Sequence, residues 1–269
     1  MIRTLLTVSI LGTLLAAAAP VPQTPTEKAW LILQQGLANK RAEKRADAVH
    51  ALRLLTNNPR AQEMAEHALA DQNPKVRATA ARALGPMGAA SSLPKLKALL
   101  NDKEPAVVLA AAHSLFLLGD REDSYEIDYE MLIGERKTAD GFVASGVNEL
   151  KNPKAVAVIG FETGLGFVPF GGDAYEVFKR ARKDDRTPVR AAAARELATD
   201  KDPKIRAALA RACADKQWRV RAATVDAIAK IEDPAMLNAI TPVLDDKSDM
   251  VRDEASAAVL RLSSGKTGE

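Results

Sequence analysis

The stretch NPKVRATAARALG, residues 73–85, carries the pattern that decides the fold, and TPVRAAAAREL, residues 187–197, repeats it. In both, a Val-Arg pair is followed by alanine four positions after the valine and by leucine eight positions after it. Spacings of four and eight place these side chains on one face of an α-helix. The small residue lets a neighbouring helix approach closely, and the large one fills the groove beside it. Each stretch therefore predicts a helix that packs tightly against another.

The same helix recurs along the chain. Its aligned pairs begin at Lys44, Val76, Val107, Val189, Val220 and Val251, at intervals of 31 or 32 residues apart from one interval of 82. Shorter helices are predicted between them, over residues 60–70, 93–100, 173–182, 203–214 and 234–244, where prolines and short polar turns mark helix starts. Two helices per period predict an all-α solenoid of about six or seven stacked antiparallel helix pairs.

These repeats resemble the HEAT repeat, in the short form also found in bilin lyases, over about residues 40–119 and 173–262. Val108 in place of arginine and Lys44 in place of an apolar residue depart from the pattern. The resemblance implies a superhelical scaffold that binds a protein partner through its concave face, and by itself it does not identify that partner. The alternative is an enzyme or cofactor-handling protein like the HEAT-like lyases and hydroxylases. The His-Glu pair that binds iron in some HEAT-like hydroxylases is absent, since His67 is followed by Ala68.

The first residues have the features of an export signal. Arg3 precedes an uncharged, leucine-rich run, and Ala16 and Ala18 form an Ala-x-Ala site, so residues 1–18 are expected to be a signal peptide cleaved after Ala18. The alternative is a retained anchor. We expect a bacterial periplasmic or secreted protein with no stable membrane span after cleavage. The expected divisions are a proline-rich linker at 19–25, repeats at 26–119, an atypical segment at 120–172, repeats at 173–263 and a flexible tail at 264–269.

Composition narrows the possible chemistry. The chain has 269 residues, 47% of them hydrophobic, and a net charge of only +3 with both signs interspersed, which argues against a nucleic-acid partner. One cysteine excludes a disulfide framework within one chain, and with only three histidines beside it a Cys/His zinc site is not expected unless carboxylates complete it. Cys213 stands where leucine stands elsewhere and is expected to be a buried thiol. We expect no catalytic residue, no metal and no cofactor, and a monomeric chain.

The interval of 82 residues contains the atypical segment. Eight of the eleven aromatic residues lie between positions 125 and 178, and nine of the fifteen glycines lie between 119 and 172. Apolar side chains on a glycine-rich loop at 164–172 are typical of an interface anchor. The predicted partner-binding residues are Phe161, Phe167, Val168, Pro169, Phe170, Tyr175 and Phe178. The alternative is that the loop folds back and fills a step between repeats of different pitch.

A recurring arginine is the remaining candidate. Arg45, Arg77, Arg190, Arg206, Arg221 and Arg252 are expected to be structural, each holding a turn carboxylate or carbonyl of its own or the next repeat with its planar donor group. The alternative is a groove of arginines that recognises acidic groups on a partner.

Overall fold

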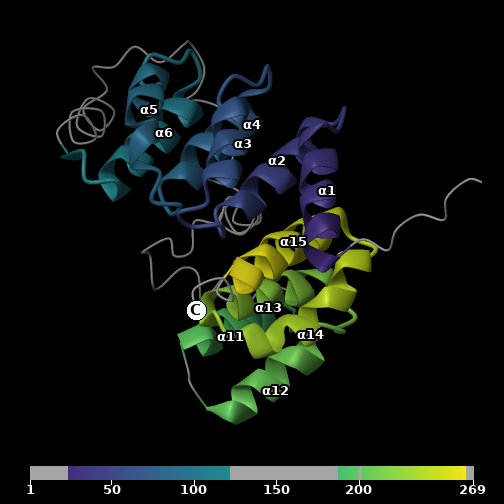
Figure 1. The fold of residues 1–269 in the computed structure, drawn as a ribbon. Coiled ribbons are helices and arrows are strands. Elements are labelled where there is room, and N and C mark those ends of the chain that lie inside the picture. The colour runs from purple at the N-terminus through teal and green to yellow at the C-terminus, as the bar shows by residue number, and fades with distance from the viewer. Residues whose placement is uncertain (1–23, 122–186, 200–201, 265–269) are drawn as a thin grey trace, which may run out of the picture.

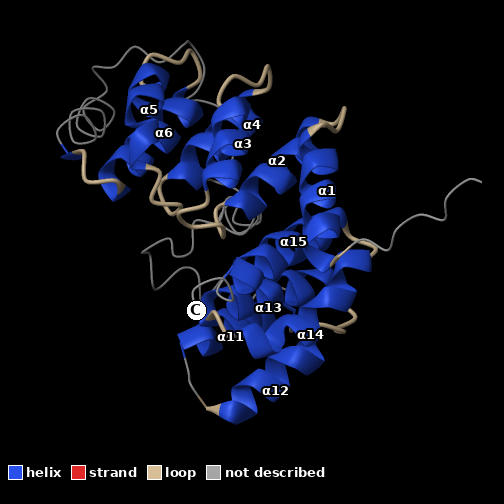
Figure 2. Ribbon diagram, in the orientation of Figure 1, coloured by secondary structure: helices blue, strands red, loops and turns tan. Residues whose placement is uncertain are grey.

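The computed structural model describes residues 24–121, 187–199 and 202–264 of the chain, and these ranges contain helices and loops but no strand (Figure 2). The predicted signal peptide, residues 19–23 of the linker, residues 122–172 of the atypical segment, the helix predicted over 173–182 and residues 265–269 of the tail lie outside the described residues. The expected α-solenoid is present (Figure 1).

The helices alternate between two rows. The inner helices, the second members of each pair, are α2 (Ala42–Leu52), α4 (Pro74–Leu84), α6 (Pro105–Leu117), α11 (Thr187–Glu196), α13 (Trp218–Ile231) and α15 (Asp249–Ser264). The outer helices are α1 (Pro25–Leu37), α3 (Pro59–Ala68), α5 (Leu93–Leu99), α12 (Pro203–Ala212) and α14 (Leu237–Ile240). Short 3₁₀ turns occupy Ala90–Ser92, Leu197–Thr199, Pro234–Met236 (η3) and Thr241–Asp245 (η4).

Helix starts and breaks follow local chemistry. Asn58, Asn73 and Asp202 each accept a hydrogen bond from a backbone N–H in the first turn of the helix that follows. The helix predicted over 234–244 is instead split into η3, α14 and η4. Pro242 explains part of this break, because proline has no N–H to donate within a helix.

The recurrent side chains form the core. Ala48, Ala80, Ala111, Thr224 and Ala255, at the small position, are fully buried, and so are Leu52, Leu84, Leu115, Ile228 and Val259 at the large position. The pattern is wrong for α11, in which Ala193 is exposed while Ala191 and Ala194 are buried. Among the described inner helices α11 packs mainly against α13, so its second flank is covered less completely.

The spatial order of the repeats differs from their order in the chain. The inner helices lie in the order α11, α13, α15, α2, α4, α6, because α15 packs against α1 and α2 (Figure 1). The last repeat of the chain therefore precedes the first one in space. Helix α1 lies near the start of the chain, where a terminal cap would be expected. In the structure it is instead an internal element whose Ala29 and Leu33 are fully buried.

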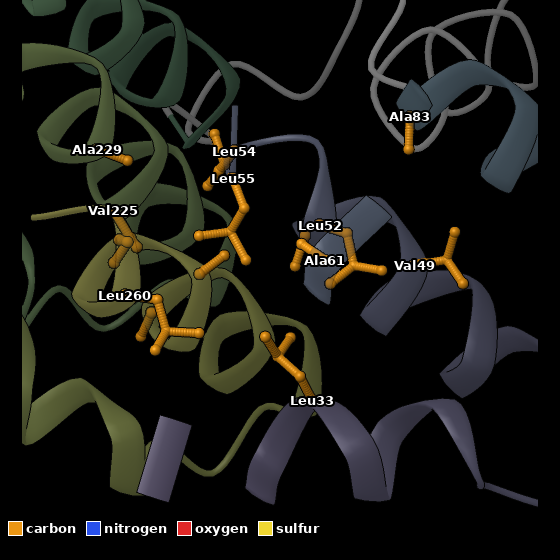
Figure 3. Close-up of a cluster of buried hydrophobic side chains, with 14 of the residues drawn as sticks. Leu33, Val49, Leu52, Leu54, Leu55, Ala61, Ala83, Val225, Ala229 and Leu260 are labelled. Carbon is orange, nitrogen blue, oxygen red and sulfur yellow. The ribbon is translucent and has the colours of Figure 1, made fainter. Parts of the chain in front are cut away.

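We call the interface between α15 and the pair α1/α2 the seam. Buried side chains of both halves gather there in one cluster, among them Leu33, Leu55 and Leu260 (Figure 3). Residues 122–186 must then connect α6, at one end of the described inner row, to α11 at the other.

Candidate functional site

The residues predicted to bind a partner, namely Phe161, Phe167, Val168, Pro169, Phe170, Tyr175 and Phe178, all lie outside the described residues. The described candidates are the polar groups of the inner row and of the seam.

Paired arginines and aspartates join successive inner helices. The guanidinium of Arg77 donates through Nε and Nη2 to both carboxylate oxygens of Asp102, at 2.8 and 2.9 Å, and through Nη1 to the carbonyl of Asp71. The same geometry recurs at 2.7 and 2.8 Å between Arg45 and Asp71. We call these pairs the staples: Arg45 with Asp71, Arg77 with Asp102, Arg190 with Asp215, and Arg221 with Asp246.

Each staple aspartate also accepts a hydrogen bond from the backbone N–H of the residue just before an inner helix. Asp71 Oδ1 accepts a hydrogen bond of 2.8 Å from the backbone N–H of Asn73, at the start of α4. The hydrogen bond from Arg45 is the main reason that the pKa of Asp71 lies below its ordinary value. These arginines thus bind carboxylates and carbonyls of the fold itself. Arg206 differs because it lies on the outer helix α12, where its Nε is 2.7 Å from Asp233.

The seam has no such staple. Asp71, Asp215 and Asp246 each stand six residues before the arginine of their own inner helix, and Asp102 stands six before Val108; Asn39 occupies that position before Arg45. Arg252 of α15, which would face it, instead pairs with Asp249 of its own helix and donates to the carbonyl of Asp246. The salt bridge that crosses the seam here joins Lys44 of α2 to Asp249 at 2.8 Å.

A second set of charges crosses the seam deeper in the structure. Arg53, just after α2, donates to Asp226 Oδ1 of α13 at 2.5 Å and to Glu254 Oε1 of α15 at 2.9 Å. Lys230 Nζ lies 2.9 Å from the other oxygen of Asp226, and His50 Nε2 lies 3.5 Å from Glu254 Oε1. We call these five residues the seam network. The side chains of Asp226 and Glu254 are only 5% and 6% exposed.

Burial sets the protonation states of the seam network. It lowers the pKa of His50 to about 3, with a further contribution from the charge of Arg53, so the imidazole is neutral at physiological pH. Burial opposes ionisation of Asp226, but the charges of Arg53 and Lys230 outweigh it and lower the pKa. Burial raises the pKa of Glu254, and Arg53 offsets this only in part. Glu254 Oε2 is buried without a hydrogen-bond partner. The seam network therefore links α2 to α13 and α15 through buried charged groups.

The seam network was not predicted from the sequence, although two of its members stand at repeat positions that hold buried apolar residues in other repeats. Glu254 occupies the repeat position at which Ala110 and Ala223 are buried. Arg53 occupies the one at which Ala229 and Leu260 are buried. A charge in an apolar slot is costly unless it is paired. Arg53 and Glu254 can pair only when α15 lies beside α2. The order of the repeats in the chain does not indicate that arrangement.

The described residues were also searched for metal sites, membrane-spanning helices and a reactive cysteine. They contain no group of three His, Cys, Asp or Glu side chains that could hold a metal ion, and none of their helices is long and apolar enough to cross a membrane. Cys213 follows α12 and is 7% exposed, and burial raises the pKa of its thiol to about 11.

Comparison with protein families matches HEAT repeats at residues 31–120 and 176–261. The chain belongs to the HEAT-repeat family. Among solved structures, this HEAT-repeat protein is similar to human deoxyhypusine hydroxylase in complex with glycerol (18% identity, 89% of this chain and 97% of that chain, TM-score 0.33). It is also similar to the CpcE and CpcF complex of phycocyanin lyase from Nostoc sp. PCC7120 (21% identity, 94% and 97%, TM-score 0.33).

An engineered protein is similar as well (15% identity, 88% of this chain and 97% of that chain, TM-score 0.29). Comparison with curated protein sequences gives no match. At these TM-scores the solved structures add nothing to the assignment of function.

Proposed function

We propose that this HEAT-repeat protein is an exported, non-catalytic scaffold, in the bacterial periplasm or outside the cell, that binds a protein partner through the concave face of its array. The observation that carries the proposal is the continuity of the inner row across the seam, from α11 to α6. Because the N-terminal and C-terminal repeats stack side by side, they offer one extended surface. Extended curved surfaces are what repeat arrays use for binding.

The aromatic segment adds the anchor of this proposal. Residues 122–186 connect α6 to α11 in the chain, so they are attached to both ends of the described inner row. The recurrent arginines and the turn aspartates are already paired within the fold. Apolar anchors are typically the residues that dominate binding energy at protein interfaces. We therefore assign partner contact to the aromatic residues predicted from the sequence, together with the concave face.

Deletion of residues 166–172 tests this proposal. The variant and the full mature chain are crosslinked in envelope extract, and bound proteins are identified by mass spectrometry. We expect unchanged helical circular dichroism and loss of the partner, whereas a matched deletion of residues 265–269 retains it. Unchanged capture would refute the role of the loop. A stoichiometric metal or a bound chromophore in the purified protein would favour the enzyme or cofactor-handling alternative.

The export part of the proposal has its own test. Expression of the full chain in a bacterial host, followed by fractionation, should yield a mature protein in the periplasm or medium that begins at Ala19 by intact mass. A protein that stays in the cytoplasm with residues 1–18 attached would contradict export.

A further inference from the structure

The seam contains a buried carboxyl group without a partner. Asp253 of α15 is 4% exposed, and its Oδ1 lies 3.3 Å from the point where Gly36 of α1 would carry a Cβ. Among the described residues it makes no hydrogen bond or ion pair. The same repeat position is filled by Ala46 in α2 and by Ala222 in α13, both buried. An ionised group here would lose most of its hydration without gaining a counter-ion.

The charges around Asp253 are mainly negative. Asp47 of α2 repels its ionised form, and so do Asp249 and Glu254 of its own helix. Arg252 attracts it weakly, because Arg252 is engaged by Asp249 and by a backbone carbonyl. Burial, followed by repulsion from these three carboxylates, raises the pKa of Asp253 to about 8.

Among the described residues, the cations of the elements around this carboxyl group are bound to other carboxylates. Lys44 of α2 is held by Asp249 at 2.8 Å. Lys28 of α1 is held by Asp245 of η4 at 2.5 Å. On α13, Arg221 is held by Asp246 and Lys230 by Asp226.

We propose that the seam is a proton-controlled joint, closed on α1 and α2 while Asp253 is neutral and opened when Asp253 ionises, so that the two halves of the array separate while each stays folded. The joint lies where the regular staple is missing, because Asn39 replaces the aspartate that Arg252 would bind. Every other junction between neighbouring described inner helices has a staple. This inference goes beyond the proposed scaffold function.

The direction of the pH response follows from linkage. When the seam is open, Asp253 titrates near the ordinary value of 3.8, and when closed it titrates at about 8. Between these two pKa values the closed form binds one more proton than the open form. The closed form therefore becomes less stable relative to the open form as pH rises from the lower value to the higher one. The ratio of closed to open protein should fall by up to about tenfold per pH unit in that interval and level off above it.

The test measures the separation of the two halves directly. Spin labels are placed on cysteines at the exposed positions Glu63 of α3 and Lys204 of α12, on opposite sides of the seam, in the mature chain with Cys213→Ala. Distance distributions between the two labels are recorded by pulsed electron paramagnetic resonance from about pH 5 to about pH 9. This interval brackets the raised pKa of Asp253. We expect one short distance at acidic pH and a growing population of longer distances towards alkaline pH, with unchanged helical circular dichroism.

Three variants assign the response. Asp253→Asn should keep the short distance at every pH. Asp47→Asn removes a like charge and should move the plateau to lower pH, and it serves as the second variant if Asp253→Asn does not fold. Asp102→Asn changes a staple aspartate whose pKa is lowered, so it should leave the wild-type profile intact. A wild-type distance independent of pH, or an identical profile in Asp253→Asn, would overturn the proposal even if thermal stability varied with pH.

Discussion

Replacing Arg53 with methionine tests whether the seam network joins the two halves into one cooperative unit. Arg53 donates to Asp226, to Glu254 and to the carbonyl of His50. Methionine keeps much of the apolar stem, so the change removes mainly the charge and the hydrogen bonds. Asp226 then retains Lys230 at 2.9 Å, whereas Glu254 loses its hydrogen-bond donor and keeps the neutral His50 and the favourable charge of Arg195.

Breaking a buried ion pair by removing one member typically costs about 3–5 kcal/mol, because the other charge stays buried. The pKa of Glu254 is already raised, so this carboxyl can take up a proton after the change. We therefore expect a loss at the lower end, about 3 kcal/mol of unfolding free energy. Adding Glu254→Gln to Arg53→Met should cost less than the sum of the two single changes, since both act on one contact.

The assay is urea unfolding at neutral pH, followed by circular dichroism. Because stability in a repeat array is a sum of repeat and interface terms, the weakened seam should also split one transition into two. Lys95→Met is the matched control: Lys95 pairs with Glu66 but is 58% exposed, so its loss should cost less than about 1 kcal/mol. A loss below about 1 kcal/mol for Arg53→Met, with a single transition, would refute the reasoning.

Four further outcomes are expected. Gly36→Ala places a Cβ 2.6 Å from that of Ala48 and should cost about 1–3 kcal/mol, seen as a lower Tm that Ala48→Gly restores. Asn39→Asp should complete a staple with Arg252 and raise Tm by an amount that Arg252→Met abolishes; an unchanged Tm contradicts this. Cys213 should react with iodoacetamide only after denaturation, and fast labelling of the folded protein contradicts its burial. The lowered pKa values of the staple aspartates should make Tm fall as pH drops below about 4, whereas a flat profile contradicts their role.

The sequence predicted features that depend on residues close together in the chain, such as helix faces and helix starts. Spacing placed Leu52 and Leu84 on buried helix faces, and the prolines and asparagines marked helix starts correctly. The order of the inner row could not be predicted, because the apolar face of one repeat fits that of any other. Only paired departures from the pattern, such as Arg53 and Glu254, indicate which repeats are neighbours. These residues lie about two hundred positions apart in the chain, so their pairing emerges only from the tertiary structure.

The staples and the seam respond to pH with opposite signs, which bears on how the array could move. Each half contains two staples, and their ionised aspartates hold the inner helices together most firmly at neutral and alkaline pH. Asp253 acts in the other direction, because its proton favours the closed seam and is lost as pH rises. On the proposed joint, alkaline conditions therefore loosen the contact between the halves while leaving each half at full strength. Motion would then be confined to the seam, and the two halves would change their separation as rigid units.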